Sequence, residues 1–199
     1  YYDHPEAVRI YRLAIKRRPK NWKMPKAPAA YSREYKKRTT IVRRNKEYVR
    51  TKKLSKTSRI EMRRLERRLR FFLRKGWTLA YKKLLKDKRL IKLFHPYQLD
   101  AARARLAAGY FAAGRDKWAL NWAERAIDGS GKYLPEAHWV AGLSAWRLGN
   151  YSKSLARFDD VSESEYVSSW LLSAGAFWAA RSAMKIGKPE LYTKYLRIA

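Results

Sequence analysis

The sequence predicts an all-α fold, a superhelical array of helix hairpins of the TPR-like solenoid type. Glycines recur at Gly76, Gly114, Gly149 and Gly187, at intervals of 38, 35 and 38 residues, which is typical of a helix–turn–helix repeat. Each glycine follows one apolar stretch and precedes another, in which aromatic and small residues recur at three- and four-residue spacing. No segment has the period-two alternation of a β-strand, so we expect no sheet.

The glycines divide the second half of the chain into predicted helix pairs. Glycine adopts the left-handed conformation that ends a helix at little cost, so each glycine marks the turn within a pair. His95 and Pro96 mark a further turn, before a helix that begins near Tyr97. The predicted pairs are 60–75 with 77–87, 97–113 with 116–128, 135–148 with 151–161, and 163–186 with 188–198.

The first half of the chain is organised differently. Residues 1–18 predict one more amphipathic helix of the array, with Pro5 near its start. Residues 19–58 contain several prolines and then a basic stretch with few core-forming residues, which predicts a linker and a basic segment. The helical-repeat domain is expected to cover residues 59–199.

The charge is large and uneven. The chain has a net charge of +30. Residues 1–99 carry 33 Lys and Arg against 7 Asp and Glu, whereas residues 100–199 carry 14 against 10. The first half therefore suggests an anionic partner, and the second half a normal globular surface. The chain has no cysteine, which excludes disulfides and thiolate chemistry, and no apolar run of membrane-spanning length.

A dense basic tract supplies the candidate binding residues. It contains none of the sequence signatures of a zinc knuckle, an RNA-recognition string or a helix-turn-helix core. Three interpretations stay open: a solvated helix face, a surface that binds an anionic wall polymer or lipid, and a surface that binds nucleic acid. The candidate residues are Arg43, Arg44, Arg63, Arg64, Arg67 and Arg68, with Lys52 and Lys53 in the same tract.

The stretch Glu163-Ser164 could be the acid of a sugar-cleaving site. However, Ser162 and Glu165 stand as S-x-x-E before an apolar run, which is the pattern of a capping box. The negative charges of Asp159, Asp160 and Glu163 would then be stabilised by the positive, N-terminal end of the helix dipole. A general acid needs burial or a like-charged neighbour in a cleft, so we expect a structural role here and no catalytic residue.

Seven tryptophans, the three histidines at 4, 95 and 138, and an acidic group are further candidate site residues. The tryptophans at 77, 118, 122, 139, 146, 170 and 178 could be platforms for sugar rings, but most fall at helix-core spacing, which favours packing. The histidines lack metal-ligand spacing, and the acidic residues 159–165 lack the pattern of a calcium loop. We therefore expect no metal and no cofactor.

Two strings carry a resemblance to a known family. They are "HWVAGLSAWRLGNYSKSLARFDDV" at 138–161 and "SSWLLSAGAFWAARSAMKIGKPELYTKYLRIA" at 168–199. Both resemble the superhelical domain of soluble lytic transglycosylases. Residues 1–19 and 99–126 are similar to the alphaproteobacterial branch of that family, so the resemblance covers most of 1–19 and 97–199.

The resemblance implies a periplasmic, peptidoglycan-cleaving parent protein. Enzymes of this family cut glycan strands to 1,6-anhydromuramyl products with one glutamate, in a Glu-Ser motif followed by Gly-Leu-Met-Gln, in a separate lysozyme-like domain. Residues 163–164 are Glu-Ser, but no Gly-Leu-Met-Gln follows, so no catalytic residue is carried over. We expect a non-catalytic scaffold for glycan strands, inactive alone, from a secreted parent whose catalytic domain begins after Ala199.

Residues 35–70 depart from the family pattern, because nothing in the family requires so dense a basic stretch. Either this stretch is specific to one lineage, or the resemblance does not hold there. The alternative function, of another class, is a free-standing helical-repeat adaptor that binds protein or nucleic acid through a basic face. The oligomeric state and the residues that face a ligand do not follow from the sequence.

Overall fold

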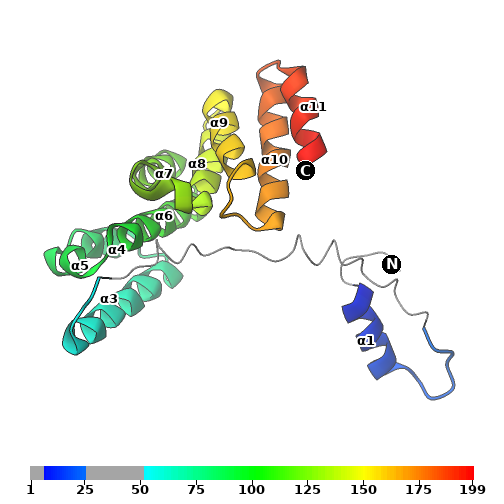
Figure 1. Cartoon of the computed structure of the whole chain (residues 1–199), viewed down its shortest axis with the longest axis horizontal. Helices are drawn as coiled ribbons and strands as arrows, with labels where there is room; N and C mark the ends of the chain where they lie inside the picture. Colours follow the sequence, from blue (N-terminus) through cyan, green and yellow to red (C-terminus); the bar gives the residue numbers. More distant parts are fainter. Residues whose placement is uncertain (1–6, 26–51) are drawn as a thin grey trace. The chain divides into compact units, whose positions relative to one another are not determined.

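The protein is described here by a computed structural model that covers residues 7–25 and 52–199. Over these residues it is all-helical, with ten α-helices, one short 3-10 helix and no strand. The chain divides into two compact units, Tyr1–Thr40 and Ile41–Ala199 (Figure 1). The all-α class predicted from the sequence is therefore confirmed for the described part of the chain.

The first unit contains helix α1, Ala7–Arg17. The predicted N-terminal helix is thus confirmed over these residues, whereas Pro5 and the predicted start lie outside the described ranges. The basic side chains Lys16 and Arg17 lie in its last turn, where the helix dipole favours positive charge. Several apolar side chains of α1 are exposed: Val8, Ile10, Leu13 and Ile15.

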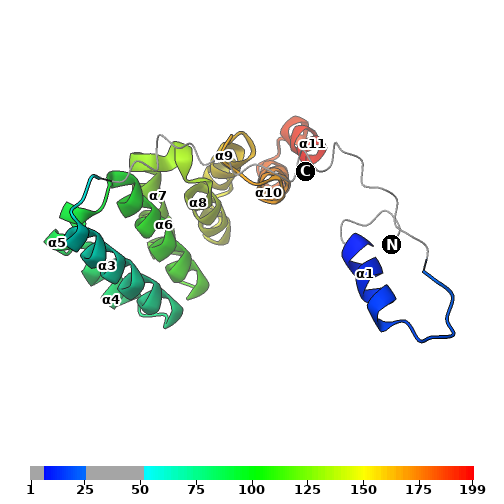
Figure 2. The ribbon, with the colours of Figure 1, turned by 60° about the horizontal axis from the view of Figure 1, so that its bottom comes forward.

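The second unit contains the remaining helices. Helices α6 to α11 follow one another along the unit, and each packs against the next (Figures 1 and 2). The bounds are α3 Lys56–Arg74, α4 Thr78–Leu85, α5 Lys88–Leu93, α6 Pro96–Ala112, α7 Asp116–Ser130, the 3-10 helix η1 Gly131–Tyr133, α8 Pro135–Arg147, α9 Tyr151–Ser162, α10 Ser169–Lys185 and α11 Pro189–Ile198.

The four predicted glycine turns are confirmed. Gly76, Gly114, Gly149 and Gly187 have φ values of 68°, 70°, 75° and 70°, in the left-handed region that a residue with a Cβ adopts at a cost. They lie between α3 and α4, α6 and α7, α8 and α9, and α10 and α11. At each of the four positions, therefore, the same kind of glycine turn ends one helix and precedes the next.

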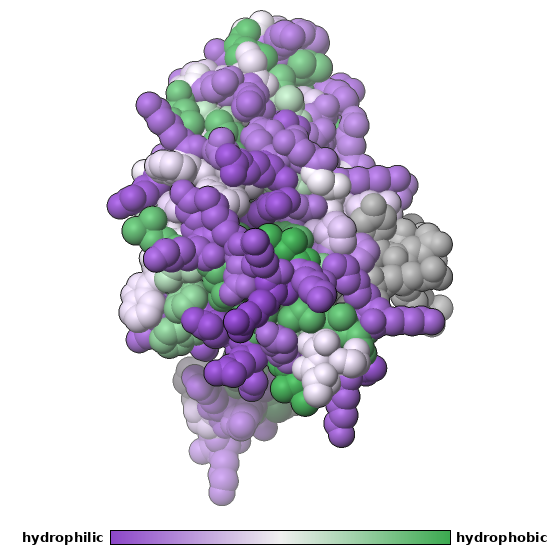
Figure 3. Space-filling view, turned by 90° about the vertical axis from the view of Figure 1, so that its left-hand side faces the viewer, coloured by the Kyte–Doolittle hydropathy of each residue, from purple (hydrophilic) through white to green (hydrophobic). Residues whose placement is uncertain are grey.

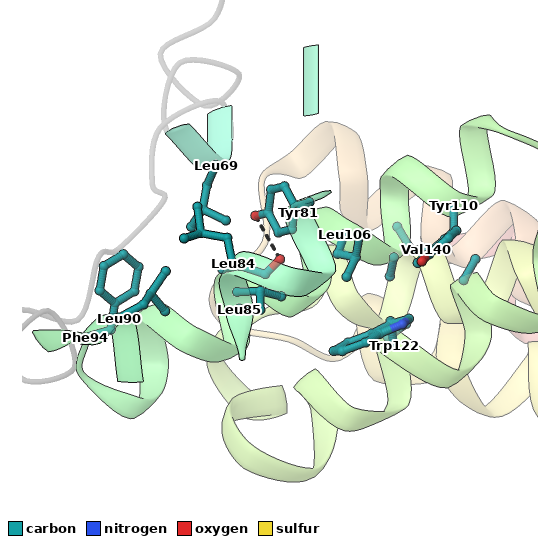
Figure 4. Close-up of a cluster of buried hydrophobic side chains, with 14 of the residues drawn as sticks. Leu69, Tyr81, Leu84, Leu85, Leu90, Phe94, Leu106, Tyr110, Trp122 and Val140 are labelled. Atoms are coloured by element: carbon teal, nitrogen blue, oxygen red, sulfur yellow. Dashed lines mark hydrogen bonds between the residues drawn. The ribbon is translucent and has the colours of Figure 1, made fainter. Parts of the chain in front are cut away.

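The larger core joins α3 to α8. Tyr81, Leu90 and Leu106 are almost fully buried within it, and Trp122 packs beside them (Figure 4). The buried Tyr81 hydroxyl donates a hydrogen bond of 3.1 Å to the Ala102 carbonyl oxygen. This bond ties α4 to α6 and satisfies a polar group that would otherwise be costly to bury.

The second core joins α8 to α11 through small residues. A Cβ at Gly142 would lie 2.8 Å from the Phe158 ring, and a Cβ at Gly175 would lie 2.6 Å from Val161 Cγ1. Helix α9 therefore approaches both α8 and α10 too closely for a larger side chain at either glycine. Ser154 and Ser182 share a buried hydrogen bond of 3.1 Å in the same seam, between α9 and α10.

The predicted helix 77–87 is confirmed by α4, but one helix was not predicted. A separate short helix, α5, follows α4 after a break at Asp87. The Asp87 carboxylate accepts a 2.8 Å hydrogen bond from the Arg89 backbone N–H, which is an N-cap that the sequence reading missed. The predicted turn at His95 is confirmed, because His95 caps α6.

The predicted capping box at Ser162 and Glu165 is wrong. Ser162 is the last residue of α9, and its hydroxyl donates to the Asp159 carbonyl oxygen. Helix α10 begins at Ser169, and Ser168 caps it by accepting a hydrogen bond from the Leu171 backbone N–H. Both serines lie shortly before apolar residues, so the sequence pattern alone does not show which of them caps α10.

Candidate anion-binding site

Helix α3 positions the exposed arginines of the candidate site. Ser55 caps the helix, because its hydroxyl accepts a 3.2 Å hydrogen bond from the Ser58 backbone N–H. Leu65 and Leu69 bury one face of the helix against the larger core. The apolar residues recur at three- and four-residue spacing, so the arginines between them are directed away from the core.

Four of the predicted binding residues share this helix. Arg63, Arg64, Arg67 and Arg68 are all exposed, and the pairs 63/67 and 64/68 are separated by one helical turn. The Arg68 guanidinium lies 5.8 Å from the Phe72 ring centroid. Within the described residues, no carboxylate pairs with any of these four guanidinium groups, so their charge is available to a ligand.

The structure brings Lys52 and Lys53 of the predicted basic tract together with Arg59, which the sequence analysis did not single out. A hollow beside the start of α3 is lined by Lys52, Lys53, Arg59 and Arg63, with Leu54 and Met62. Lys52 Nζ donates 2.9 Å to the Lys92 carbonyl oxygen, and Arg59 Nε donates 3.1 Å to the Leu54 carbonyl oxygen. The first bond ties the segment before α3 to α5, and the second ties it to α3. No local sequence pattern predicts the first of these contacts.

The charge around α3 to α5 is strongly one-sided. Residues 52–92 contain 17 Lys and Arg against 3 Asp and Glu. The other two predicted binding residues, Arg43 and Arg44, lie outside the described ranges. The face toward the viewer in Figure 3 is mostly hydrophilic, with separate hydrophobic areas between long polar side chains.

A second hollow surrounds the Glu163 that resembled a catalytic acid. His138, Asp160, Glu163 and Glu165 are among its lining residues. Burial favours a raised pKa for Asp160, but His138 and Arg157 outweigh it, so the pKa of Asp160 is lowered. His138 Nδ1 lies 2.8 Å from Asp160 Oδ2, and Arg157 Nη1 lies 3.1 Å from the same oxygen.

This hollow does not have the groups that general acid catalysis needs. Asp160 is held in its charged form, and Glu163 is an exposed residue at the C-terminal end of α9. Arg157 also binds Glu124 of α7 with hydrogen bonds of 2.5 and 3.1 Å, so its guanidinium has a structural role. Glu124 and Asp160 therefore join α7, α8 and α9 through Arg157 and His138.

The expectation that most tryptophans pack in the core is only partly confirmed. Trp122 is 5% exposed, but Trp77, Trp118 and Trp170 are 53%, 50% and 73% exposed. The remaining three, Trp139, Trp146 and Trp178, are half-buried. Spacing at three and four residues does not separate the buried face of a helix from a neighbouring exposed one, which explains the error.

In residues 7–25 and 52–199, no group of three or more His, Cys, Asp or Glu side chains could hold a metal ion. No helix in those ranges has both the length and the apolar composition that crossing a membrane requires.

No protein-family model, curated protein or solved structure matches the chain. We therefore infer the function from the residues and the geometry of the described part of the chain.

Proposed function

We propose that the chain is a non-catalytic, solenoid-like helical scaffold whose basic surface on α3 binds an anionic polymer of the bacterial cell wall. The observation that supports this most is the row of exposed arginines on α3, which has no carboxylate partner among the described residues. The stem peptides of peptidoglycan carry carboxylates, and guanidinium groups pair with carboxylates in a bidentate geometry.

The resemblance to lytic transglycosylases adds the biological setting of the proposal. The strings that carry it, at 138–161 and 168–199, form the helix pairs α8–α9 and α10–α11 with their glycine turns. We infer that these pairs continue a superhelical array that holds glycan strands for a catalytic domain elsewhere in a periplasmic parent protein. Glu163, which resembled the family's general acid, is exposed, so we expect this chain alone to release no 1,6-anhydro product.

Co-sedimentation with purified sacculi tests the proposal. Arg63→Ala/Arg64→Ala/Arg67→Ala/Arg68→Ala should lower the bound fraction at least tenfold at low salt, because four charge-assisted contacts are lost. The matched control is Lys117→Ala/Lys153→Ala/Lys185→Ala/Lys188→Ala, which removes the same charge from exposed sites in the second half of the chain. Equal losses in both variants would indicate only a non-specific effect of net charge.

A second candidate function is nucleic-acid binding. It is favoured by the 17 basic residues in 52–92, because phosphate contacts depend on the density of Lys and Arg. Nucleic-acid binding would show a steep loss of affinity with salt, and the same four-arginine variant would reduce that slope. A chain that bound nucleic acid in this way and ignored sacculi would replace the first proposal with the second.

A further inference from the structure

The turn between α3 and α4 carries an exposed apolar patch. Phe71, Trp77 and Leu79, which we call the turn patch, are 39%, 53% and 72% exposed. Trp77 and Leu79 also line a shallow hollow with Ala113 and Arg115, at the neighbouring turn between α6 and α7. Large apolar side chains that gather on a surface in this way usually mark a contact site.

The patch is held in a fixed position. The Trp77 backbone N–H donates a 2.8 Å hydrogen bond to the Phe72 carbonyl oxygen, across the turn at Gly76. The Trp77 ring packs edge-on against Phe71, with 5.6 Å between the ring centroids, and lies 6.1 Å from Phe72. The backbone bond and the ring contacts therefore present the patch in one geometry.

The turn itself does not require these apolar residues. In the other three glycine turns, polar residues take the place of Trp77, one residue after the glycine: Arg115, Asn150 and Lys188. Polar residues also take the place of Leu79, three residues after the glycine: Lys117, Ser152 and Glu190. The same backbone turn thus forms with polar side chains, and the patch at the α3–α4 turn needs another explanation.

Positive charge surrounds the patch. Residues 67–86 contain eight Lys and Arg and no Asp or Glu. Arg70, Arg74 and Lys75 are exposed on the last turns of α3, and Arg115 borders the hollow from the next turn. The partner of this surface must therefore accept apolar side chains and supply negative charge at the same place.

We propose that the turn patch docks on the surface of an anionic phospholipid bilayer. Trp77, Leu79 and Phe71 enter the boundary between headgroups and acyl chains, where tryptophan is favoured and apolar area leaves water. The arginines and lysines beside them contact the lipid phosphates. This is a peripheral contact, and it goes beyond the wall binding proposed above.

Charge complementarity separates this partner from the alternatives. A second copy of the chain would bring one strongly positive patch against another, which is unfavourable. Nucleic acid would pair with the basic side chains but would gain little from Leu79, the most exposed member of the patch. An anionic bilayer matches both the apolar and the basic side chains.

Vesicle co-sedimentation tests the proposal, with vesicles of phosphatidylglycerol mixed with phosphatidylcholine and vesicles of phosphatidylcholine alone. The patch variant is Trp77→Ser/Leu79→Ser. The matched control, Trp170→Ser/Met184→Ser, removes two apolar side chains that are 73% and 68% exposed on α10. A charge variant, Arg74→Ala/Lys75→Ala, tests the basic side chains, and circular dichroism checks that every variant folds.

The native chain should bind the anionic vesicles and not the neutral ones. The patch variant should bind about tenfold more weakly or worse, and the charge variant should lose several-fold per residue removed, whereas the control should bind as the native chain does. Equal binding to both kinds of vesicle, or equal losses in the patch and control variants, overturns the proposal. A dimer that the patch variant abolishes also overturns it, in favour of a second copy.

The result can be separated from wall binding. The patch variant retains all four arginines of the α3 site, so its sedimentation with sacculi should be unchanged. Loss of sacculus binding in the patch variant would show that both surfaces serve one ligand, and it would overturn the assignment of the turn patch to lipid.

Discussion

Asp100 accepts a hydrogen bond of 2.6 Å from the Ser130 hydroxyl, which joins the first half of α6 to the last residue of α7. The Asp100 residue is only 3% exposed, and its other oxygen lies 2.6 Å from Arg103 Nη1. Gly129 lies against the same carboxylate, so closely that a Cβ there would collide with it. A buried carboxylate thus fixes how this helix pair closes at the end opposite its glycine turn.

We expect Asp100→Ala to destabilise the protein by about 1–3 kcal/mol, because the Ser130 hydroxyl and the Arg103 guanidinium lose their acceptor. Ser130→Ala removes one donor and leaves Arg103 paired, so it should cost less, about 1 kcal/mol. Urea unfolding followed by circular dichroism measures both. A smaller loss in the Asp100 variant than in the Ser130 variant would contradict the role of the carboxylate.

The start of α10 can be tested with two serines. Ser168→Ala removes the N-cap and should lower the free energy of unfolding by about 1 kcal/mol. Ser162→Ala should cost about 0.5 kcal/mol or less, because the Ser162 hydroxyl bonds a carbonyl within α9 and caps nothing. Thermal unfolding of the two variants under the same conditions compares these losses. A larger loss in Ser162→Ala than in Ser168→Ala would support the capping box expected at residues 162–165.

The close approach of α9 and α10 predicts an unusual outcome at Gly175. Glycine to alanine in a helix normally stabilises by up to about 1 kcal/mol. Here the new Cβ would meet Val161, so we expect Gly175→Ala to destabilise by about 1–3 kcal/mol. The double variant Gly175→Ala/Val161→Ala should be less destabilised than the sum of the single variants, and additive losses in chemical denaturation would argue against the contact.

Tyr81 predicts a specific loss of stability at alkaline pH. Burial raises the pKa of Tyr81 to about 12, although the nearby charge of Arg105 opposes this. Because the unfolded chain titrates near pH 10, the stability that the neutral hydroxyl contributes is complete below about pH 10 and is lost as the pH rises toward 12.

Comparison with Tyr81→Phe isolates this effect from the other tyrosines and the lysines. The native chain should lose more free energy of unfolding than the phenylalanine variant between about pH 10 and about pH 12. At neutral pH the variant should be less stable by about 1 kcal/mol, because the bond to the Ala102 carbonyl is lost. Parallel pH profiles for the two proteins would show that Tyr81 does not titrate with unfolding.

Much of the fold could be predicted because its signals are local. The glycines at 76, 114, 149 and 187 need only a left-handed backbone, and each lies where the spacing placed it. The start of α10 could not be predicted in the same way, since Ser162 and Ser168 offer similar capping chemistry. The choice between them depends on where α9 stops, which packing against α8 and α10 decides.

The candidate site was predictable only in part. The basic tract on α3 follows directly from composition, and the exposure of its arginines follows from the leucines at 65 and 69. The hollow that joins Arg59 to Lys52 depends on a contact between residues 52 and 92, and no local pattern predicts a contact over that separation. Exposure of Trp77 and Trp170 was missed for the same reason, because it depends on which face the next helix covers.

The central claim is that the arginines of α3 serve a cell-wall polymer, and competition tests it most directly. The native chain is bound to purified sacculi, and duplex nucleic acid is then added in increasing amounts at physiological salt. The account predicts that the chain stays with the sacculi, and that the four-arginine variant fails to bind them at the outset. Complete transfer of the native chain to nucleic acid, with the four-arginine variant losing affinity for nucleic acid instead, would contradict it.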